Sequence, residues 1–202
     1  MRRALRLLMI ILLIFLCGSG LSFSRTESLL HEWCGMFLVV CVLLHLACNR
    51  KWFIRLFKGK YNRYRGFTTI IDMILIALIV LAAVSGMMIS GYVFSFLDLG
   101  GTAWGRRMHL AGTAWLFLLS GIHFGMHMRN DKRNVLLYIV AACGIAAFAI
   151  SRFYERLFLI SEFAYVLSVS PWIIYLIHAF IFSTFMCVGN EIRLLVVKKN
   201  EM

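Results

Sequence analysis

Long apolar stretches, separated by short polar and basic segments, dominate the chain. A backbone in lipid must satisfy its own hydrogen bonds, so stretches of this kind are predicted to be α-helices. Most of them reach the roughly 20 residues that a bilayer crossing needs, and the fifth lies at the lower limit. The sequence therefore predicts an all-α membrane protein with six transmembrane helices: Ala4–Phe23, Leu29–Cys48, Phe67–Tyr92, Met108–Met128, Val135–Ile150 and Tyr165–Gly189.

Composition supports this interpretation. Of the 202 residues, 62% are hydrophobic and 15% are charged, and the mean hydropathy is +0.86. Soluble domains average about 45–50% apolar and about 25% charged residues. These values exclude a disordered chain, a disulfide scaffold and a typical cytosolic enzyme. The net charge of +12 lies in clusters between the apolar stretches, which is typical of membrane loops and not of a nucleic-acid-binding surface.

The distribution of basic residues predicts the orientation. With the N-terminus inside, 16 of the 21 Lys and Arg residues fall in inner segments. Because inner loops of membrane proteins are enriched in Lys and Arg, both termini are expected in the cytoplasm. The first stretch, with Cys17-Gly18-Ser19-Gly20 near its end, also resembles a signal peptide. Its cleavage would move the basic C-terminus outside, so a retained helix is favoured.

The first four predicted helices form an internal repeat of two helical hairpins, at about residues 4–52 and 67–130. In each hairpin the first helix ends near a Ser-Gly pair, and the second carries two histidines fourteen residues apart. We therefore predict a four-helix bundle in residues 1–130. Residues 131–202 are expected to be a two-helix C-terminal part with an outer amphipathic connector, Ser151–Ser168. The repeated histidines are His31 and His45, then His109 and His123.

The histidine spacing suggests metal chemistry. Fourteen residues rise about 21 Å along an α-helix and rotate to within about 40° of four full turns. Each pair thus lies on one helix face at two depths, with His31 and His109 near the outer surface and His45 and His123 toward the inner one. An imidazole in hydrocarbon needs a polar partner. Two facing histidines could hold a haem iron from both sides, and the alternative is four core histidines bonded to backbone or water.

Two further histidines are assigned differently. His127 lies one turn beyond His123 and could replace it as the inner ligand, or bind a quinone or a haem propionate. Depth favours His123, because His127 would sit about 6 Å lower. His178 has no counterpart in the repeat and is predicted to be a core histidine with satisfied hydrogen bonds.

Small and basic residues near the outer histidines extend the predicted site. Gly35 and Gly112 would leave room for a porphyrin, although small residues also serve ordinary helix packing. Arg106 and Arg107 could bind haem propionates through paired hydrogen bonds, although interfacial charge can have the same pattern. None of the six cysteines forms C-x-x-C, which excludes the usual zinc, thioredoxin and covalent haem motifs.

Four motifs surround the repeated histidines: His31-Glu32-Trp33-Cys34-Gly35, His45-x-x-x-Asn49-x-x-Trp52, His109 and His123-x-x-x-His127. Through these motifs the chain resembles, over nearly its whole length, the flavinylation-associated cytochrome family of bacterial membrane proteins. The C-terminal stretch from Phe153 to Ala164 is similar to that family more loosely, and Arg50 stands where a tryptophan often follows the asparagine. The histidine spacing is also similar to that of the haem core of respiratory cytochrome b.

The resemblance implies two b-type haems, transmembrane electron transfer and a multi-pass location in the bacterial cytoplasmic membrane. It implies an extracytoplasmic flavoprotein or FMN-binding domain as partner, often with iron–sulfur or quinone-linked donors. Carried over by position, the haem ligands would be four histidines, with His127 also matching a family histidine. Those four are His31, His45, His109 and His123.

Three functions are open at this point. The first is an electron-transfer subunit that passes electrons across the membrane to or from a flavin-bearing partner, with the connector capping the outer haem and docking that partner. The second is a quinol-oxidising or metal-reducing cytochrome, an oxidoreductase in which His127, Glu32 and His178 would move protons and a quinone would bind. The third is a haem-free membrane anchor.

Overall fold

The computed structural model describes residues 2–19, 25–101, 103–128, 135–165 and 167–198, and within these ranges it is helical without strands. Each of the six predicted stretches contains a helix, although Phe67–Tyr92, Met108–Met128 and Tyr165–Gly189 also include non-helical residues. Two short helices lie between the stretches, at Arg50–Leu56 and Phe153–Phe158, and a 3-10 turn occupies Ser95–Leu97. The α-helices are α1 (Arg2–Ser19), α2 (Arg25–Cys48), α3 (Arg50–Leu56), α4 (Arg63–Met88), α5 (Ala103–Met126), α6 (Val135–Ile150), α7 (Phe153–Phe158) and α8 (Pro171–Lys198).

Three of the described helices, α2, α4 and α8, are long and apolar enough to cross a membrane. Helix α6 is apolar but shorter. Helix α1 opens with three arginines, and α5 mixes Arg106 and Arg107 with glycines, histidines and a serine, which lowers the mean hydropathy of both. The chain is therefore an all-helical protein with three candidate transmembrane helices, which suggests a membrane protein.

Five of the six predicted helices begin at other residues than predicted, and for two of them the start has a clear local reason. Helix α4 starts at Arg63 because the side chain of Asn62 accepts a hydrogen bond from the Arg65 backbone N–H at 2.7 Å, an N-cap that precedes the apolar stretch. Helix α8 starts at Pro171, after the predicted start at Tyr165, since proline fits the first helical position and cannot sit further inside. Periodicity alone does not detect either signal.

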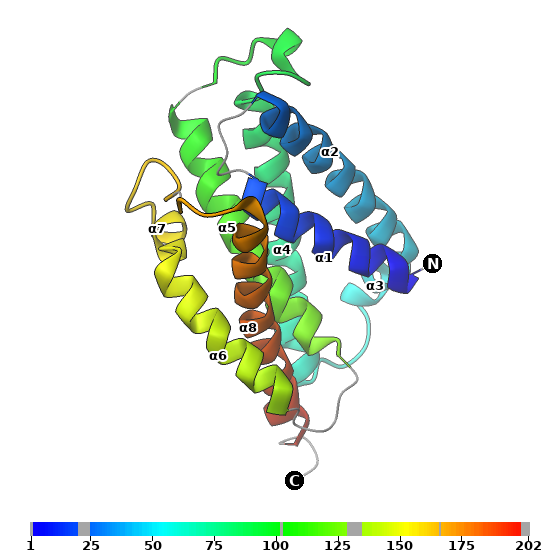
Figure 1. Ribbon diagram of the computed structural model, residues 1–202. Coiled ribbons are helices and arrows are strands. Elements are labelled where there is room, and N and C mark those ends of the chain that lie inside the picture. The colour runs from blue at the N-terminus through cyan, green and yellow to red at the C-terminus, as the bar shows by residue number, and fades with distance from the viewer. Residues whose placement is uncertain (1, 20–24, 102, 129–134, 166, 199–202) are drawn as a thin grey trace.

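Helices α4, α5 and α8 lie side by side, with α6 on the far side of α8 and α7 against α5 (Figure 1). The main core is formed between α5, α6, α7 and α8, where Phe117, Phe153 and Ile181 are fully buried. A smaller core around Leu12, Leu38 and Cys41 joins α1 to α2. The C-terminal helices therefore pack directly against the predicted four-helix unit, since α8 also contacts α1.

The two helices that carry the repeated histidines are not packed tightly against each other. Helix α2 packs mainly on α1 and contacts α4 only sparsely, whereas α5 packs on α4 and α8. We call the end with Ser19, His31, Ser85 and His109 the outer end, and the end with His45, Asp72 and His123 the inner end, after the predicted orientation. The loop of residues 89–101 lies at the outer end (Figure 1).

Close packing of α5 on α8 depends on glycine. A Cβ atom added at Gly125 would lie 2.0 Å from the Met186 carbonyl oxygen, so the two backbones touch where no side chain fits. Gly125→Ala is expected to push the helices apart and to lower the free energy of unfolding by about 1–3 kcal/mol. Gly66→Ala is the matched control, because a Cβ there meets nothing within 4 Å. Thermal unfolding in detergent measures both, and equal stability of the two variants would contradict this packing.

Candidate functional site

The outer histidines of the two hairpins come together. His31 on α2 and His109 on α5 have ring centroids 6.3 Å apart and planes inclined by 69°. Both side chains are half-buried. The contact joins residues 78 positions apart across the loosely packed α2–α5 gap. The expectation that these two histidines face each other is therefore met.

Each outer histidine is held at Nδ1 by a serine at or near the end of the preceding long helix. The Oγ atom of Ser19 lies 3.1 Å from Nδ1 of His31, and that of Ser85 lies 3.2 Å from Nδ1 of His109. The two serines are buried. The Ser-Gly pairs noted as a repeat in the sequence thus mark hydrogen-bonding partners, a role that the sequence analysis did not assign.

A backbone carbonyl fixes the tautomer of His109. The Ala82 carbonyl oxygen lies 3.1 Å from its Nδ1, and a carbonyl can only accept a hydrogen bond. Nδ1 therefore carries the hydrogen, and Nε2 keeps a lone pair that can bind a metal. Gly86 makes room for the ring, since a Cβ there would lie 3.2 Å from Cε1 of His109.

The inner group is built around a carboxylate. Oδ1 of Asp72, on α4, lies 2.8 Å from Nδ1 of His123 as an ion-pair contact, and has no hydrogen-bond partner within the described residues. The rings of His123 and His127 have centroids 4.7 Å apart. One ligand atom from each of these three residues lies within 4.8 Å of the others, so the group has the donors that a metal ion needs.

His45 approaches this group from α2. It lines a cavity of about 190 Å³ together with Arg6 and Asn49. The Asn49 side chain donates a hydrogen bond to the His45 carbonyl at 2.7 Å and so closes the end of α2. His45 and His123 share the inner end as predicted, without the ring contact seen between the outer histidines.

Asp72 is the candidate site residue that the sequence analysis missed. It is the one acidic residue in the predicted span Phe67–Tyr92. An ionisable side chain within an apolar helix is by itself a reason to look for function, and that signal was present. The sequence could not show that His123 lies beside Asp72, because this contact depends on how α4 packs against α5.

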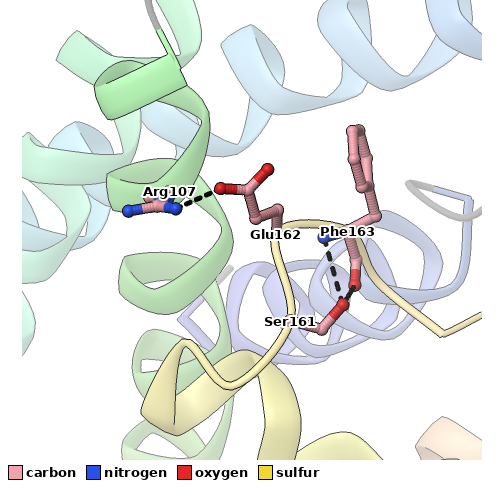
Figure 2. A network of polar contacts seen from close by, with 4 residues as sticks. All are labelled: Arg107, Ser161, Glu162 and Phe163. Carbon is pink, nitrogen blue, oxygen red and sulfur yellow. Dashed lines mark hydrogen bonds and ion pairs between the residues drawn. The ribbon is translucent and has the colours of Figure 1, made fainter.

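The remaining predicted site residues are two glycines and two arginines, which lie in different surroundings. Gly35 borders open space, whereas Gly112 lies against Leu81, with only 3.0 Å between an added Cβ and its Cδ2. The Arg107 guanidinium forms an ion pair with Glu162 of the connector, as Figure 2 shows. Arg106 lies over the ring of Phe163, 5.4 Å from its centroid. Both arginines thus join the outer end of α5 to the connector.

His178 lies apart from both histidine groups. It is 1% exposed, its Nδ1 lies 2.8 Å from the Ile174 carbonyl, and its ring packs on Phe117 and Phe153. This is the core histidine that the sequence predicted, although its Nε2 has no hydrogen-bond partner within the described residues.

The residue next to His31 fastens the outer loop. The Glu32 carboxylate accepts hydrogen bonds from the Ser90 hydroxyl and from the backbone N–H groups of Gly91, Tyr92 and Val93, at 2.7–3.2 Å. One side chain on α2 therefore organises the chain that leaves α4. These hydrogen bonds do not require Glu32 to transfer protons.

Glu32→Gln is expected to loosen that loop, because the amide nitrogen cannot accept the hydrogen bonds that a carboxylate oxygen takes. Hydrogen exchange at the amides of Gly91 and Val93 should speed up about tenfold, which corresponds to about 1.4 kcal/mol of local stability. Asp98→Asn, at an exposed position of the same loop, is the control and should leave exchange unchanged. Unchanged exchange in Glu32→Gln would contradict the anchoring role.

No family model, curated protein or solved structure matches the chain.

Proposed function

We propose that this chain is a dihaem b-type electron-transfer protein of the membrane, which passes electrons across the bilayer to or from an extracytoplasmic flavin-bearing partner. The observation that carries the proposal is the outer pair, His31 and His109, whose ring centroids are 6.3 Å apart. A metal ion bonded to two imidazole nitrogens at about 2.0–2.1 Å each holds the ring centroids roughly 6 Å apart. The separation of the His31 and His109 rings therefore fits an iron atom bonded to one imidazole on each side.

The surroundings of the outer pair also suit a porphyrin. Sparse contact between α2 and α4 and the open space beside Gly35 leave room between the hairpins. Ser19 and Ser85 hold both rings at Nδ1, so that Nε2 of each is the atom available to a metal. A haem bound here would be held by His31 and His109.

The inner pair supports a second haem less directly. His45 and His123 share one end of the bundle, and Asp72 engages His123 at Nδ1, as carboxylates do with metal-binding histidines. Of the two candidates on α5, His123 has this partner, whereas His127 lies just beyond the helix and is exposed. We therefore assign His45 and His123 as the inner ligands.

When bound, each haem supplies a one-electron carrier, and the rest of the work belongs to the protein. The four histidines hold the two sites at different depths. Ser19, Ser85 and the Ala82 carbonyl hold Nδ1 of the outer histidines by hydrogen bonds, and Asp72 Oδ1 lies 2.8 Å from Nδ1 of His123. Apolar side chains on α2 and α4 face outward, where lipid would cover them and exclude water.

Six crossings and cytoplasmic termini are part of the same proposal. Besides the three candidate transmembrane helices, α1, α5 and α6 run through the same bundle and are mostly apolar. The basic residues cluster at the inner end, which favours cytoplasmic termini. The resemblance to flavinylation-associated cytochromes, in the histidine motifs, supports the same arrangement.

Electron transfer across vesicle membranes tests this function. The purified protein would be reconstituted into vesicles that enclose dithionite, with ferricyanide outside as an acceptor that cannot cross the bilayer. We expect reduction of the external acceptor at a rate well above that of empty vesicles. His31→Ala vesicles should fall to the empty-vesicle rate, and the same rate with and without the wild-type protein would overturn the proposal.

The connector is the proposed docking face for the flavoprotein. Phe158 and Phe163 are 65% and 57% exposed, and the ion pair of Arg107 with Glu162 fixes this segment near the outer end of α5 (Figure 2). Most of the preceding residues of α7 are different, since Phe153, Arg156 and Leu157 are buried and the Leu157 carbonyl accepts a hydrogen bond from Trp115 of α5. The exposed rings of Phe158, at the end of α7, and of Phe163 are thus the surface offered to a partner.

Replacing Phe158 and Phe163 with serine is expected to slow electron transfer to an extracytoplasmic flavoprotein about tenfold or more, without loss of haem. Exposed aromatic anchors at a docking face typically contribute about 2 kcal/mol each. Trp172→Ser, which removes an exposed aromatic ring at the start of α8, is the control. Flavin absorbance measures the rate, and an unchanged rate in the double variant would contradict docking at this surface.

A further inference from the structure

A buried arginine lies at the outer end, with no counter-ion among the described residues. Arg156 on α7 is 5% exposed, and Nε and Nη2 of its guanidinium have no hydrogen-bond partner within the described residues. Its one described hydrogen bond runs from Nη1 to the Cys17 carbonyl at 3.3 Å. Burial lowers its pKa, but a guanidinium stays protonated at neutral pH. The protein therefore holds a positive charge in an apolar place.

The groups around Arg156 leave its charge uncompensated. Phe153 lies under the guanidinium, 5.2 Å from its centre, and Cys17 contributes only a carbonyl dipole. The adjacent acid, Glu155, is engaged by Arg152 in an ion pair. His178 packs on the same Phe153 ring, and its Nε2 is also without a partner. A water could satisfy both Arg156 and His178, but it would not neutralise the charge.

Helix α1 connects this charge to the outer histidine pair. Arg156 bonds the carbonyl of Cys17, two residues before Ser19, and Ser19 holds Nδ1 of His31. The acid nearest that pair, Glu32, has its carboxylate satisfied by three backbone N–H groups and a hydroxyl. At the inner end charges of both signs lie close to the histidines, because Asp72 contacts His123 and Arg6 lines the cavity beside His45.

From this arrangement we infer that Arg156 biases the outer site toward its reduced state, so that electrons run downhill from the inner to the outer end. The inference rests on the proposed function. A fixed positive charge in an apolar surrounding stabilises whichever state carries one more electron, and buried charges are screened far less than exposed ones. The effect weakens with distance, so the outer site gains more than the inner one. Arg156 acts on the outer site through its charge and contacts neither proposed haem site.

Redox titration of the purified full chain, followed by haem absorbance, tests the inference. The wild type is expected to titrate in two steps, of which His31→Ala removes the one at higher potential. In Arg156→Met that same step should move to lower potential, which corresponds to a roughly three- to tenfold smaller reduced-to-oxidised ratio at a fixed applied potential. Arg156→Lys should keep the wild-type step, because it keeps the charge.

A purely structural role of Arg156 predicts something different. Loss of the bond to Cys17 would lower haem content or stability in Arg156→Met and Arg156→Lys alike, without moving a potential. Arg156→Gln, which keeps polar donors without the charge, should shift the step as the methionine variant does, and serves if that variant fails to fold. If the higher-potential step does not move in Arg156→Met, or moves equally in Arg156→Met and Arg156→Lys, the inference is wrong but the proposed function stands. A purified protein without haem would overturn both.

Discussion

His31→Ala is expected to remove the outer haem and to leave the inner one in place. His109 already supplies the ligand on the other side, and the other histidine of α2, His45, lies about 21 Å further along the helix and cannot replace His31. An iron site with one of its two protein ligands removed loses most of its binding free energy. The haem content should therefore fall from two per chain to one.

His109→Ala should have the same result, since the two imidazoles hold the same iron from opposite sides. Cys34→Ala, one turn further along α2, is the matched control and should retain both haems. Haem extraction with protein quantification measures all three variants. If His31→Ala and His109→Ala depleted different haems, the facing arrangement would be wrong.

His123→Ala and His127→Ala are expected to differ sharply. Only His123 has its Nδ1 engaged by a carboxylate, at 2.8 Å from Asp72, and it shares the depth of His45. His127 lies about one turn, or roughly 6 Å, further toward the inner end and is exposed. Loss of His123 should therefore remove the inner haem, whereas loss of His127 should leave two haems per chain.

The pair of variants is its own control, because both remove an imidazole from the same end of α5. Difference spectra and haem content distinguish them directly. Retention of the inner haem in His123→Ala together with its loss in His127→Ala would exchange the two assignments. Asp72→Asn should weaken inner haem binding without abolishing it, since partners of this kind typically contribute about 10–100-fold in metal affinity.

The apolar pattern predicted where the six long helices lie, because each of these helices contains a long apolar stretch. Helix α6 occupies Val135–Ile150, as predicted. The errors lie at the ends, where single residues decide. Pro171 starts the last helix and the Asn62 cap starts α4, and neither belongs to the apolar pattern. Left-handed backbone at Arg152 and Leu159 delimits α7, which the sequence analysis treated as part of a longer amphipathic connector.

The histidine repeat predicted which residues meet, but not what holds them. His31 and His109 face each other as their matched spacing implied. The inner pair departs from that symmetry, because Asp72 of α4 lies beside His123, whereas α1, the corresponding helix of the first hairpin, has no acidic residue between Arg2 and Ser19. Contacts such as Ser85 to His109 join different helices, so they depend on packing that spacing within one helix does not contain.

The central claim is that two pairs of histidines bind two haems, and the direct test is the haem content of the purified chain together with the electron paramagnetic resonance spectrum of its oxidised form. The account predicts two haems per chain, each giving a low-spin signal of iron between two imidazoles. A colourless protein, or haem in a five-coordinate high-spin form, would contradict it.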